Sequence, residues 1–354
     1  MNSKERVNLA LDRKEPDRVP FGEWGVDHDT VEHIIGRPSL WRNRRQNTLL
    51  TWAGKRDELV EGWMRDIVDL VKAVDYDLVP VFLVPPKDIK PSDIKQVDAE
   101  NWQSSDGRIF RYSAANDDIR CISAPKQEKQ VESIDEFRER FEESLVPGSG
   151  FKLSRSKGKY KFKFVADDTL ELVRHVVKTL GKEKFVFARG FHGGFELPYF
   201  GGMEQFFITL ATNPELVRGA LAMLTDLDIA LADVFIKEGV DCVMGGADMS
   251  DSNGPMASPQ CIRGIYLPEM KRFSVHAKKR GVRVMSHNCG NNIKIMDILI
   301  ESGMEAWQSI QAVLPALDMK RLKNDYGAKL TLWGGINIET LHDGTPEDNR
   351  RDVL

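Results

Sequence analysis

The chain has 354 residues, of which 41% are hydrophobic and 29% are charged, and its formal net charge is −4. This composition is typical of a folded globular protein and excludes disordered and fibrous classes. The nearly balanced charge provides no field that would hold nucleic acid or an anionic membrane, so we expect small molecules and proteins as partners.

The amino-terminal segment and the cysteines indicate the cellular compartment. Residues 1–6 are charged where a signal peptide needs an apolar core, and no run reaches the roughly 18–20 apolar residues of a membrane span. We therefore expect a cytoplasmic protein. Its four cysteines have no clustered spacing, which predicts reduced thiols, one of which could be a metal ligand: Cys121, Cys242, Cys261 and Cys289.

The first half of the chain predicts two strands and an insertion. The strands are Val19–Trp24 and Asp77–Phe82, separated by a helix with an apolar face formed by Leu59, Trp63, Ile67 and Val71. The regular pattern then breaks over residues 85–160. We interpret this stretch as an insertion within one domain, a hairpin with a surface helix.

From about residue 160, short apolar runs alternate with helical patterns, as in βαβ units. Asn213 and Ser258 each precede a proline, which predicts two capped helix starts. Glycines after the amphipathic runs predict left-handed helix ends: Gly181, Gly239, Gly281 and Gly303. The predicted strands are Lys184–Arg189, Asp241–Gly245, Arg283–His287, Ala306–Ile310 and Lys329–Trp333.

These elements predict one domain over residues 1–354 with a (β/α)8 TIM-type barrel fold. The insertion follows the second unit. Seven strands are predicted where a closed barrel needs eight, and the sequence stops inside a seventh helix that starts at Thr345-Pro346-Glu347. We therefore expect further residues, or another element, to close the barrel.

Five motifs in this order resemble the uroporphyrinogen decarboxylase superfamily. They are Glu15–Pro20, Gly193–Phe200, Gly245–Asp248 running on to Pro259, His287–Asn291 and Leu332–Asn337. The resemblance implies a barrel with its active site at the carboxyl ends of the strands. The superfamily contains porphyrinogen decarboxylases and zinc-dependent methyltransferases, which exchange methyl groups with a corrinoid carried by a partner protein.

The residues after the first predicted strand separate these branches. The decarboxylases resemble one another in an arginine-rich segment there, whereas Phe21–Asp29 contains three acidic residues and no arginine. This segment would repel a polycarboxylate. In the methyltransferases that the chain resembles, the positions of His287 and Cys289 supply two zinc ligands. A third ligand, a cysteine, sits on the last barrel strand, which is missing here, so it cannot be carried over. No Asp-x-His-x-x-Gly corrinoid signature is present, so cobalamin would come from a partner.

The residues themselves also favour a metal. On a strand, His287 and Cys289 point to the same side, and imidazole and thiolate are preferred zinc ligands. Taken alone, this pair fits a buried histidine and a core thiol at least as well. Asp248 and Gln311 are our catalytic candidates. Asp248 would be a ligand, an orienting partner, a proton donor or simply a cap. Gln311 matches a position that is acidic in related methyltransferases, but because it is neutral we expect it to hydrogen-bond substrate.

Further residues at predicted strand ends are candidates for binding substrate, and packing explains each of them equally well. They are Trp24, His192, Tyr199, Asn253, Gln308 and Trp333. The leading hypothesis is zinc-dependent methyl transfer between a small donor and the corrinoid of a partner protein. The aromatic strand ends, Trp24 and Trp333 above all, favour an aromatic methyl ether as the donor. The alternatives are a metal-independent decarboxylase of a small acid or porphyrinogen, served by Arg18 and Arg189, and a non-enzymatic scaffold.

Overall fold

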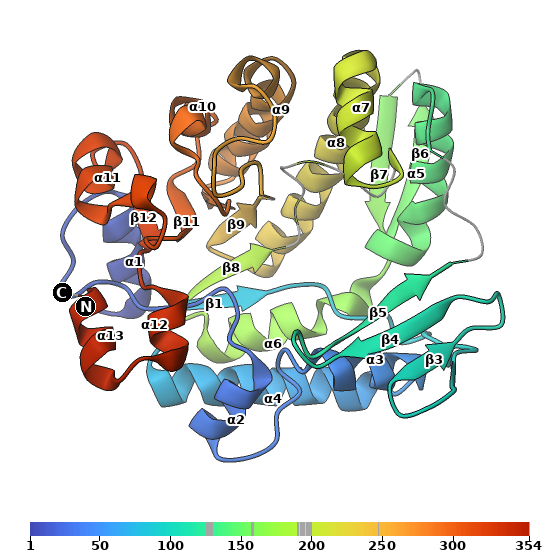
Figure 1. Ribbon diagram of the computed structural model, residues 1–354, viewed down its shortest axis with the longest axis horizontal. Coiled ribbons are helices and arrows are strands. Elements are labelled where there is room, and N and C mark those ends of the chain that lie inside the picture. The colour runs from blue at the N-terminus through green and yellow to red at the C-terminus, as the bar shows by residue number, and fades with distance from the viewer. Residues whose placement is uncertain are drawn as a thin grey trace.

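A curled parallel sheet forms the centre of the computed structural model, with helices on its outer face (Figure 1). The model describes residues 1–124, 130–156, 159–189, 191, 195, 200–246 and 248–353. Among these, the sheet has six strands in the order β1 (Leu78–Val81), β8 (Phe185–Arg189), β9 (Cys242–Gly245), β10 (Arg283–His287), β11 (Ala306–Ile310) and β12 (Thr331–Gly334). Every neighbouring pair is parallel. The predicted α/β barrel fold is confirmed as a half-barrel with β1 and β12 at its edges.

Helices connect the strands on the outside, as the alternating pattern predicts. α4 buries Leu59, Ile67 and Val71, the face expected from their spacing. The helices outside the insertion are α1 (Ser3–Leu11), α2 (His28–Ile35), α3 (Arg44–Trp52), α4 (Arg56–Val74), α6 (Glu171–Leu180), α7 (Met203–Thr212), α8 (Pro214–Glu238), α9 (Pro259–Lys279), α10 (Met296–Glu301), α11 (Met319–Tyr326), α12 (Ile338–Asp343) and α13 (Pro346–Val353).

The interior of the half-barrel has its own apolar core, distinct from the larger core beneath the outer helices. Its members alternate along the strands and include Phe187, Met244 and Met285. Val7 and Leu11 of α1 pack against them. α1 also bonds to the amino ends of three strands or the residues before them, for example from Lys4 N to Glu183 O at 2.9 Å. α1 therefore covers the amino end of the barrel and leaves the carboxyl end for a site.

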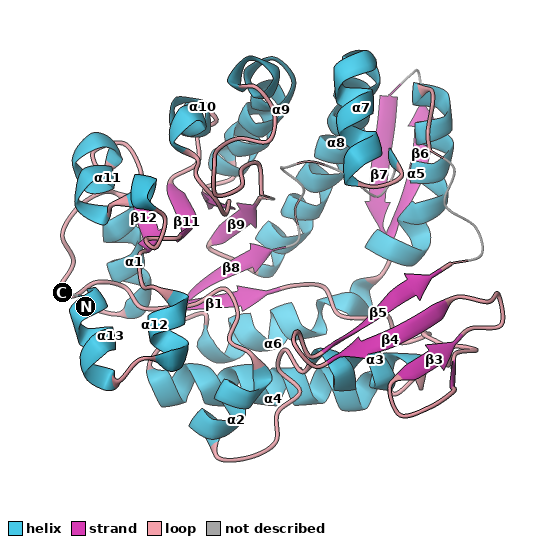
Figure 2. Ribbon diagram, viewed as in Figure 1, coloured by secondary structure: helices cyan, strands magenta, loops and turns pink. Residues whose placement is uncertain are grey.

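The insertion lies between β1 and β8 and is larger than the predicted hairpin and helix. Antiparallel strands come first, at one side of the parallel sheet (Figure 2). The helix α5 and a second hairpin follow them. The bounds are β2 (Lys95–Gln96), β3 (Asn101–Gln103), β4 (Ile109–Ser113), β5 (Asp118–Ser123), α5 (Ile134–Ser149), β6 (Phe151–Ser156) and β7 (Lys159–Phe164).

The predicted first strand, Val19–Trp24, is wrong. This segment has no ladder and is held by single bonds, because Pro20 has no amide hydrogen and the amide of Phe21 is taken by the Asp77 carboxylate at 2.7 Å. The Phe21 carbonyl accepts from Asp77 N at 2.6 Å, and the Gly22 carbonyl accepts from Trp333 Nε1 at 3.2 Å. The segment thus spans the gap between the edge strands β1 and β12.

The helix ends largely follow the predictions. The side chains of Asn213 and Ser258 cap α8 and α9. Gly239, Gly281 and Gly303 have positive φ, as expected. Gly181 is the exception, since its φ of −66° continues the right-handed turn of α6. All four cysteines, each within the described part of the chain, are free thiols. No helix among the described residues is both long and apolar enough to cross a membrane.

Candidate metal centre at the carboxyl ends of the strands

The strand register brings three predicted site residues into one row inside the barrel. His287, the last residue of β10, lies opposite Gln308 of β11, which lies opposite Trp333 of β12. Because side chains alternate along a strand, these residues point the same way as Met285 and Ala306 of the interior core, one step nearer the carboxyl end. Parallel barrels carry their active sites at this end.

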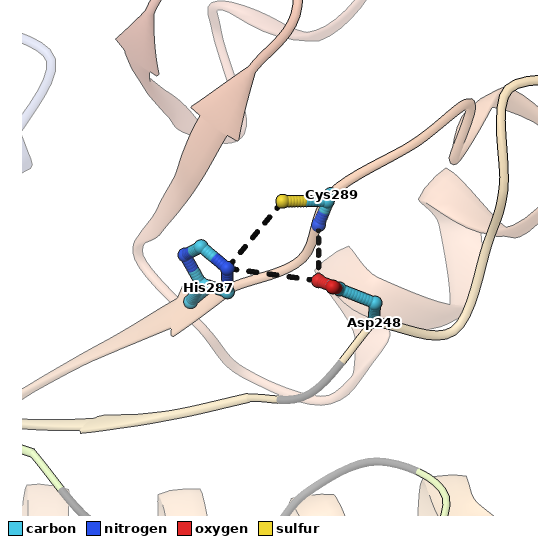
Figure 3. A group of neighbouring side chains, drawn as sticks. All are labelled: Asp248, His287 and Cys289. Atoms are coloured by element: carbon cyan, nitrogen blue, oxygen red, sulfur yellow. Dashed lines mark hydrogen bonds and ion pairs between the residues drawn. The ribbon is translucent and has the colours of Figure 1, made fainter. Parts of the chain in front are cut away.

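Asp248, His287 and Cys289 form a cluster there, with their side chains turned toward one another (Figure 3). His287 Nε2 is 3.5 Å from Cys289 Sγ and 3.6 Å from Asp248 Oδ1. One ligand atom from each residue lies within 4.8 Å of the other two. The loop after β9 thus supplies a carboxylate to the pair that the His-x-Cys spacing brings together.

The donors and their separations fit one zinc ion. Two ligands of a tetrahedral zinc are about 3.3–3.6 Å apart, given bonds of about 2.0–2.3 Å. Nitrogen, sulfur and oxygen are the donor atoms zinc takes, and three protein ligands leave a fourth position for substrate. The Asp248 side chain is half exposed, so the cluster opens to solvent on that side.

Burial raises the pKa of the Cys289 thiol, and the nearby Asp248 carboxylate adds to the rise. The hydroxyl of Ser309, 3.1 Å from the sulfur, opposes it. A metal ion bound by this sulfur would therefore displace a proton. Ser309 was not anticipated from the sequence, although it follows Gln308 directly at a predicted strand end.

Gln308 positions the histidine. Its side chain is buried, and Oε1 accepts a hydrogen bond from His287 Nδ1. With the proton on Nδ1, the lone pair of Nε2 faces Asp248 and Cys289, which is the tautomer a metal ligand needs. The predicted role of Gln308 in binding substrate stays a prediction, and its amide oxygen is already engaged behind the imidazole.

Two buried asparagines fix the backbone around the cluster. Asn292 Nδ2 donates to the carbonyls of Asn288, Cys289 and Gly290 at 3.0–3.1 Å. Asn288 Oδ1 accepts from Met249 N at 2.9 Å, which ties the loop after β10 to the loop after β9. Gly290 has a φ of +80°, and a Cβ there would lie 2.5 Å from the Ser250 carbonyl, so only glycine fits this close approach.

A family model described as uroporphyrinogen decarboxylase (URO-D) matches residues 165–354. The chain belongs to the uroporphyrinogen decarboxylase family. The match includes β8 to β12 and all three members of the cluster. The resemblance that the sequence motifs indicate is thus confirmed for this URO-D family protein.

Curated relatives are named methyltransferases. The chain is 25% identical over 184 residues to the methylcobamide:CoM methyltransferase MtbA of Methanosarcina acetivorans, over 51% of each chain. It is 26% identical over 172 residues to MtbA of Methanosarcina mazei, over 44% of this chain and 48% of the relative. The chain thus spans about half the length of the curated relatives it matches. A solved structure, a methyltransferase from Methanosarcina mazei, matches with a TM-score of 0.55 and 13% identity. The match covers 94% of this chain and 83% of the methyltransferase chain, and it shows a shared fold.

The remaining predicted residues of this URO-D family protein have different positions. Asn253 is exposed in a bend, where its backbone N–H donates to Asp251 Oδ1. Gln311 accepts from Gly290 N at 2.7 Å, so its amide group lies beside the loop that carries Cys289. Trp333 packs edge-on against Phe187, and its indole N–H is taken by Gly22. Two candidates, His192 and Tyr199, lie outside the described residues.

Trp24 lies beside the cluster, with its ring centroid 4.7 Å from that of His287. The guanidinium of Arg189 also lies near this ring, 5.3 Å from the Trp24 ring and 4.7 Å from the Phe82 ring. Desolvation raises the pKa of the Glu23 carboxyl, next to Trp24 in the chain. The segment after Pro20 therefore forms one wall of the site, although it is not a strand.

The two arginines considered for a decarboxylase lie at opposite ends of the barrel. Arg18 donates to Asp77, immediately before β1, at 2.6 Å, so it belongs to the amino end and cannot reach a substrate at the mouth. That expectation is corrected. Arg189 ends β8 and lies at the carboxyl end, as expected.

Proposed function

We propose that this protein is a zinc-dependent methyltransferase that moves a methyl group between a small molecule and the cobalt of a corrinoid held by a partner protein. The observation that carries the proposal is the Asp248–His287–Cys289 cluster at the carboxyl ends of β9 and β10. The names of the two curated relatives, methylcobamide:CoM methyltransferases, support the choice of methyl carrier.

His287, Cys289 and Asp248 would hold the zinc. Asp248 would thereby be the third protein ligand. When bound, zinc would act as a Lewis acid on the heteroatom of an ether or stabilise the thiolate form of a thiol. Gln308 keeps the His287 lone pair on the metal side, and the half-exposed Asp248 leaves the face toward solvent open for substrate.

We further propose that the methyl donor is an aromatic methyl ether. Trp24 supports this, because its ring lies against His287 and offers a flat apolar surface beside the heteroatom position. Trp333 supports it less, since its ring packs into the barrel and its N–H is satisfied. The decarboxylase alternative loses Arg18, which lies at the amino end of the barrel and is bonded to Asp77.

The first experiment measures the metal content of the purified, tag-free protein by mass spectrometry. We expect about one zinc per chain, lost in the His287→Ala, Cys289→Ala double variant and weakened in Asp248→Ala. An Asp251→Ala variant in the same loop, outside the cluster, controls for loop disruption. Zinc retained in the double variant would move the site elsewhere, and its absence from the wild type would contradict the metal proposal.

The second part assays methyl transfer with the cognate corrinoid protein in its reduced cobalt(I) state. The visible spectrum reports methylation of cobalt from a methoxybenzene donor, and the zinc-free double variant is the control. Transfer from no ether, by a protein that does hold zinc, would exclude the ether donor and leave a thiol acceptor as the substrate class to assay.

A further inference from the structure

Arg189 is a cation at the mouth of the barrel that has no counter-charge among the described residues. Its guanidinium lies between the Trp24 and Phe82 rings, and within the described part of the chain it has no hydrogen-bond acceptor or carboxylate partner. Burial lowers the pKa of Arg189 to about 10, so the side chain remains charged at neutral pH. The charge that acts on it is the cation of Arg42, which also lowers the pKa of Arg189 and is itself paired with Asp27 at 3.1 Å.

An arginine in this environment indicates a bound anion. Its desolvation costs free energy that stacking on two aromatic rings only partly offsets, and a partner anion would supply the missing interaction. The carboxylate of Glu23 does not do so, since it accepts from the amides of Trp24 and Gly25 in its own loop. With no other carboxylate of the described residues paired to Arg189, the partner that we assign to it is a ligand of the site.

The position of Arg189 relates that anion to the reaction. The Trp24 ring contacts both the Arg189 guanidinium and the His287 imidazole. A molecule bound beside Trp24 would therefore be within reach of both the Arg189 side chain and the Asp248–His287–Cys289 cluster. A bidentate guanidinium is suited to a planar carboxylate and also pairs with a sulfonate.

We propose that Arg189 determines specificity for an anionic aromatic substrate, binding its carboxylate or sulfonate while the reacting heteroatom lies over the metal cluster. This inference rests on the proposed methyl transfer for the identity of the heteroatom. It adds the class of substrate: a ring that carries both a methoxy group and an anionic group.

The test measures binding by isothermal titration calorimetry with three probes on one scaffold: 4-methoxybenzoate, 4-methoxybenzenesulfonate and uncharged methoxybenzene. The zinc-loaded wild type is compared with Arg189→Met, which keeps the packing against both rings, and Arg189→Lys, which keeps the charge. Arg42→Gln is the matched control, because it removes a neighbouring cation that already has a partner. The preferred anion in the wild type identifies the carboxylate or the sulfonate as the natural group.

We expect Arg189→Met to weaken binding of the preferred anion about 10- to 100-fold, the size of one charge-assisted interaction. Arg189→Lys should fall between, because lysine lacks the planar fork. Methoxybenzene should bind the wild type and Arg189→Met equally, which controls for the fold of the site. Equal anion affinity in the wild type and Arg189→Met, or an equal loss in Arg42→Gln, would overturn the proposal.

Methyl transfer separates this inference from the proposed function. If Arg189→Met loses anion binding but the wild type methylates no cobalt, the anion site stands and the proposed reaction fails. If the wild type demethylates neutral and anionic ethers with equal kcat/KM, the reaction stands and the role of Arg189 is overturned.

Discussion

The Gln308 side chain decides which nitrogen of His287 faces Asp248 and Cys289. Its buried amide oxygen accepts from Nδ1, and its backbone carbonyl accepts from Asn288 N at 2.6 Å. One residue of β11 therefore holds both the imidazole and the start of the loop that carries Cys289. The pairing of β10 with β11 thereby sets the orientation of the His287 imidazole.

Replacing Gln308 by Leu should weaken zinc binding about 10- to 100-fold, because the imidazole is then free to carry its proton on Nε2. Gln308→Glu keeps an acceptor and should retain zinc. Competition with a chromogenic chelator measures the affinity. Gln130→Leu, which removes an amide bonded to Thr209 away from the site, is the control. Unchanged affinity in Gln308→Leu would refute the positioning role.

At the scale of elements, the site depends on two loops that are fastened to each other. Asn292 is completely buried, and Ser250 Oγ donates to its Oδ1 at 2.9 Å. The Nδ2 group of the same side chain donates to three carbonyls of its own loop. The loops after β9 and β10 therefore behave as one unit, and their ligands cannot move independently.

Asn292→Ala should lower the free energy of unfolding by at least about 2 kcal/mol, since several buried polar groups lose their partner. Urea unfolding followed by circular dichroism measures this. Asn253→Ala, in the exposed turn of the neighbouring loop, should change stability by less than about 0.5 kcal/mol. An Asn292→Ala protein as stable as the wild type would show that the loops are held by other contacts.

The elements that periodicity predicts well are the buried, regular ones. All five strands from β8 onward lie within one or two residues of their predicted positions, because continuous apolar runs between capped helices leave few alternatives. Val19–Trp24 has the same apolar look, yet Asp77 takes its amide and no ladder forms. Such a side-chain bond across 56 residues has no signal in local sequence.

The candidate site divides in the same way. His287 and Cys289 are predicted because their spacing and a strand end place them together, and Asp248 because it closely follows the preceding strand. The orientation of Gln308 behind the histidine depends on strand register, which the sequence does not show. Arg189 was considered only for a decarboxylase, since its position between two rings depends on a segment that is not a strand.

At the scale of the whole molecule, Asp77 joins the amino-terminal helix, the segment after Pro20 and the sheet. Its fully buried carboxylate accepts from Arg6 and Arg18, each at 2.6 Å, and from the Phe21 amide. Burial alone would raise the pKa of this carboxyl, but the hydrogen bonds of Phe21, Ser3 and the two arginines outweigh it and the pKa is lowered.

This shift predicts how stability depends on pH. Because the native pKa lies below the unfolded value of about 3.9, the stabilisation is present above that value and is lost as the pH falls through the native pKa. Asp77→Asn should cost about 3–5 kcal/mol at pH 7. Its difference from the wild type should shrink during acid titration, measured by urea midpoints from pH 7 to pH 2.5.

Asp57→Asn is the matched control, because this exposed carboxylate is only one partner of Arg56, which is also bonded to Glu171. The change should alter stability by less than about 1 kcal/mol at any pH. A difference between Asp77→Asn and the wild type that stays constant down to pH 2.5 would contradict the role given to this carboxylate.

The segment between the edge strands has a second effect. The residues that bridge β1 and β12 continue directly into Trp24, so folding fixes the indole in place against His287 and Arg189 before any substrate arrives. A side chain that is already immobilised loses no rotational freedom when a ligand lands on it. The conformational entropy of this wall is lost during folding, so ligand binding does not incur that loss again.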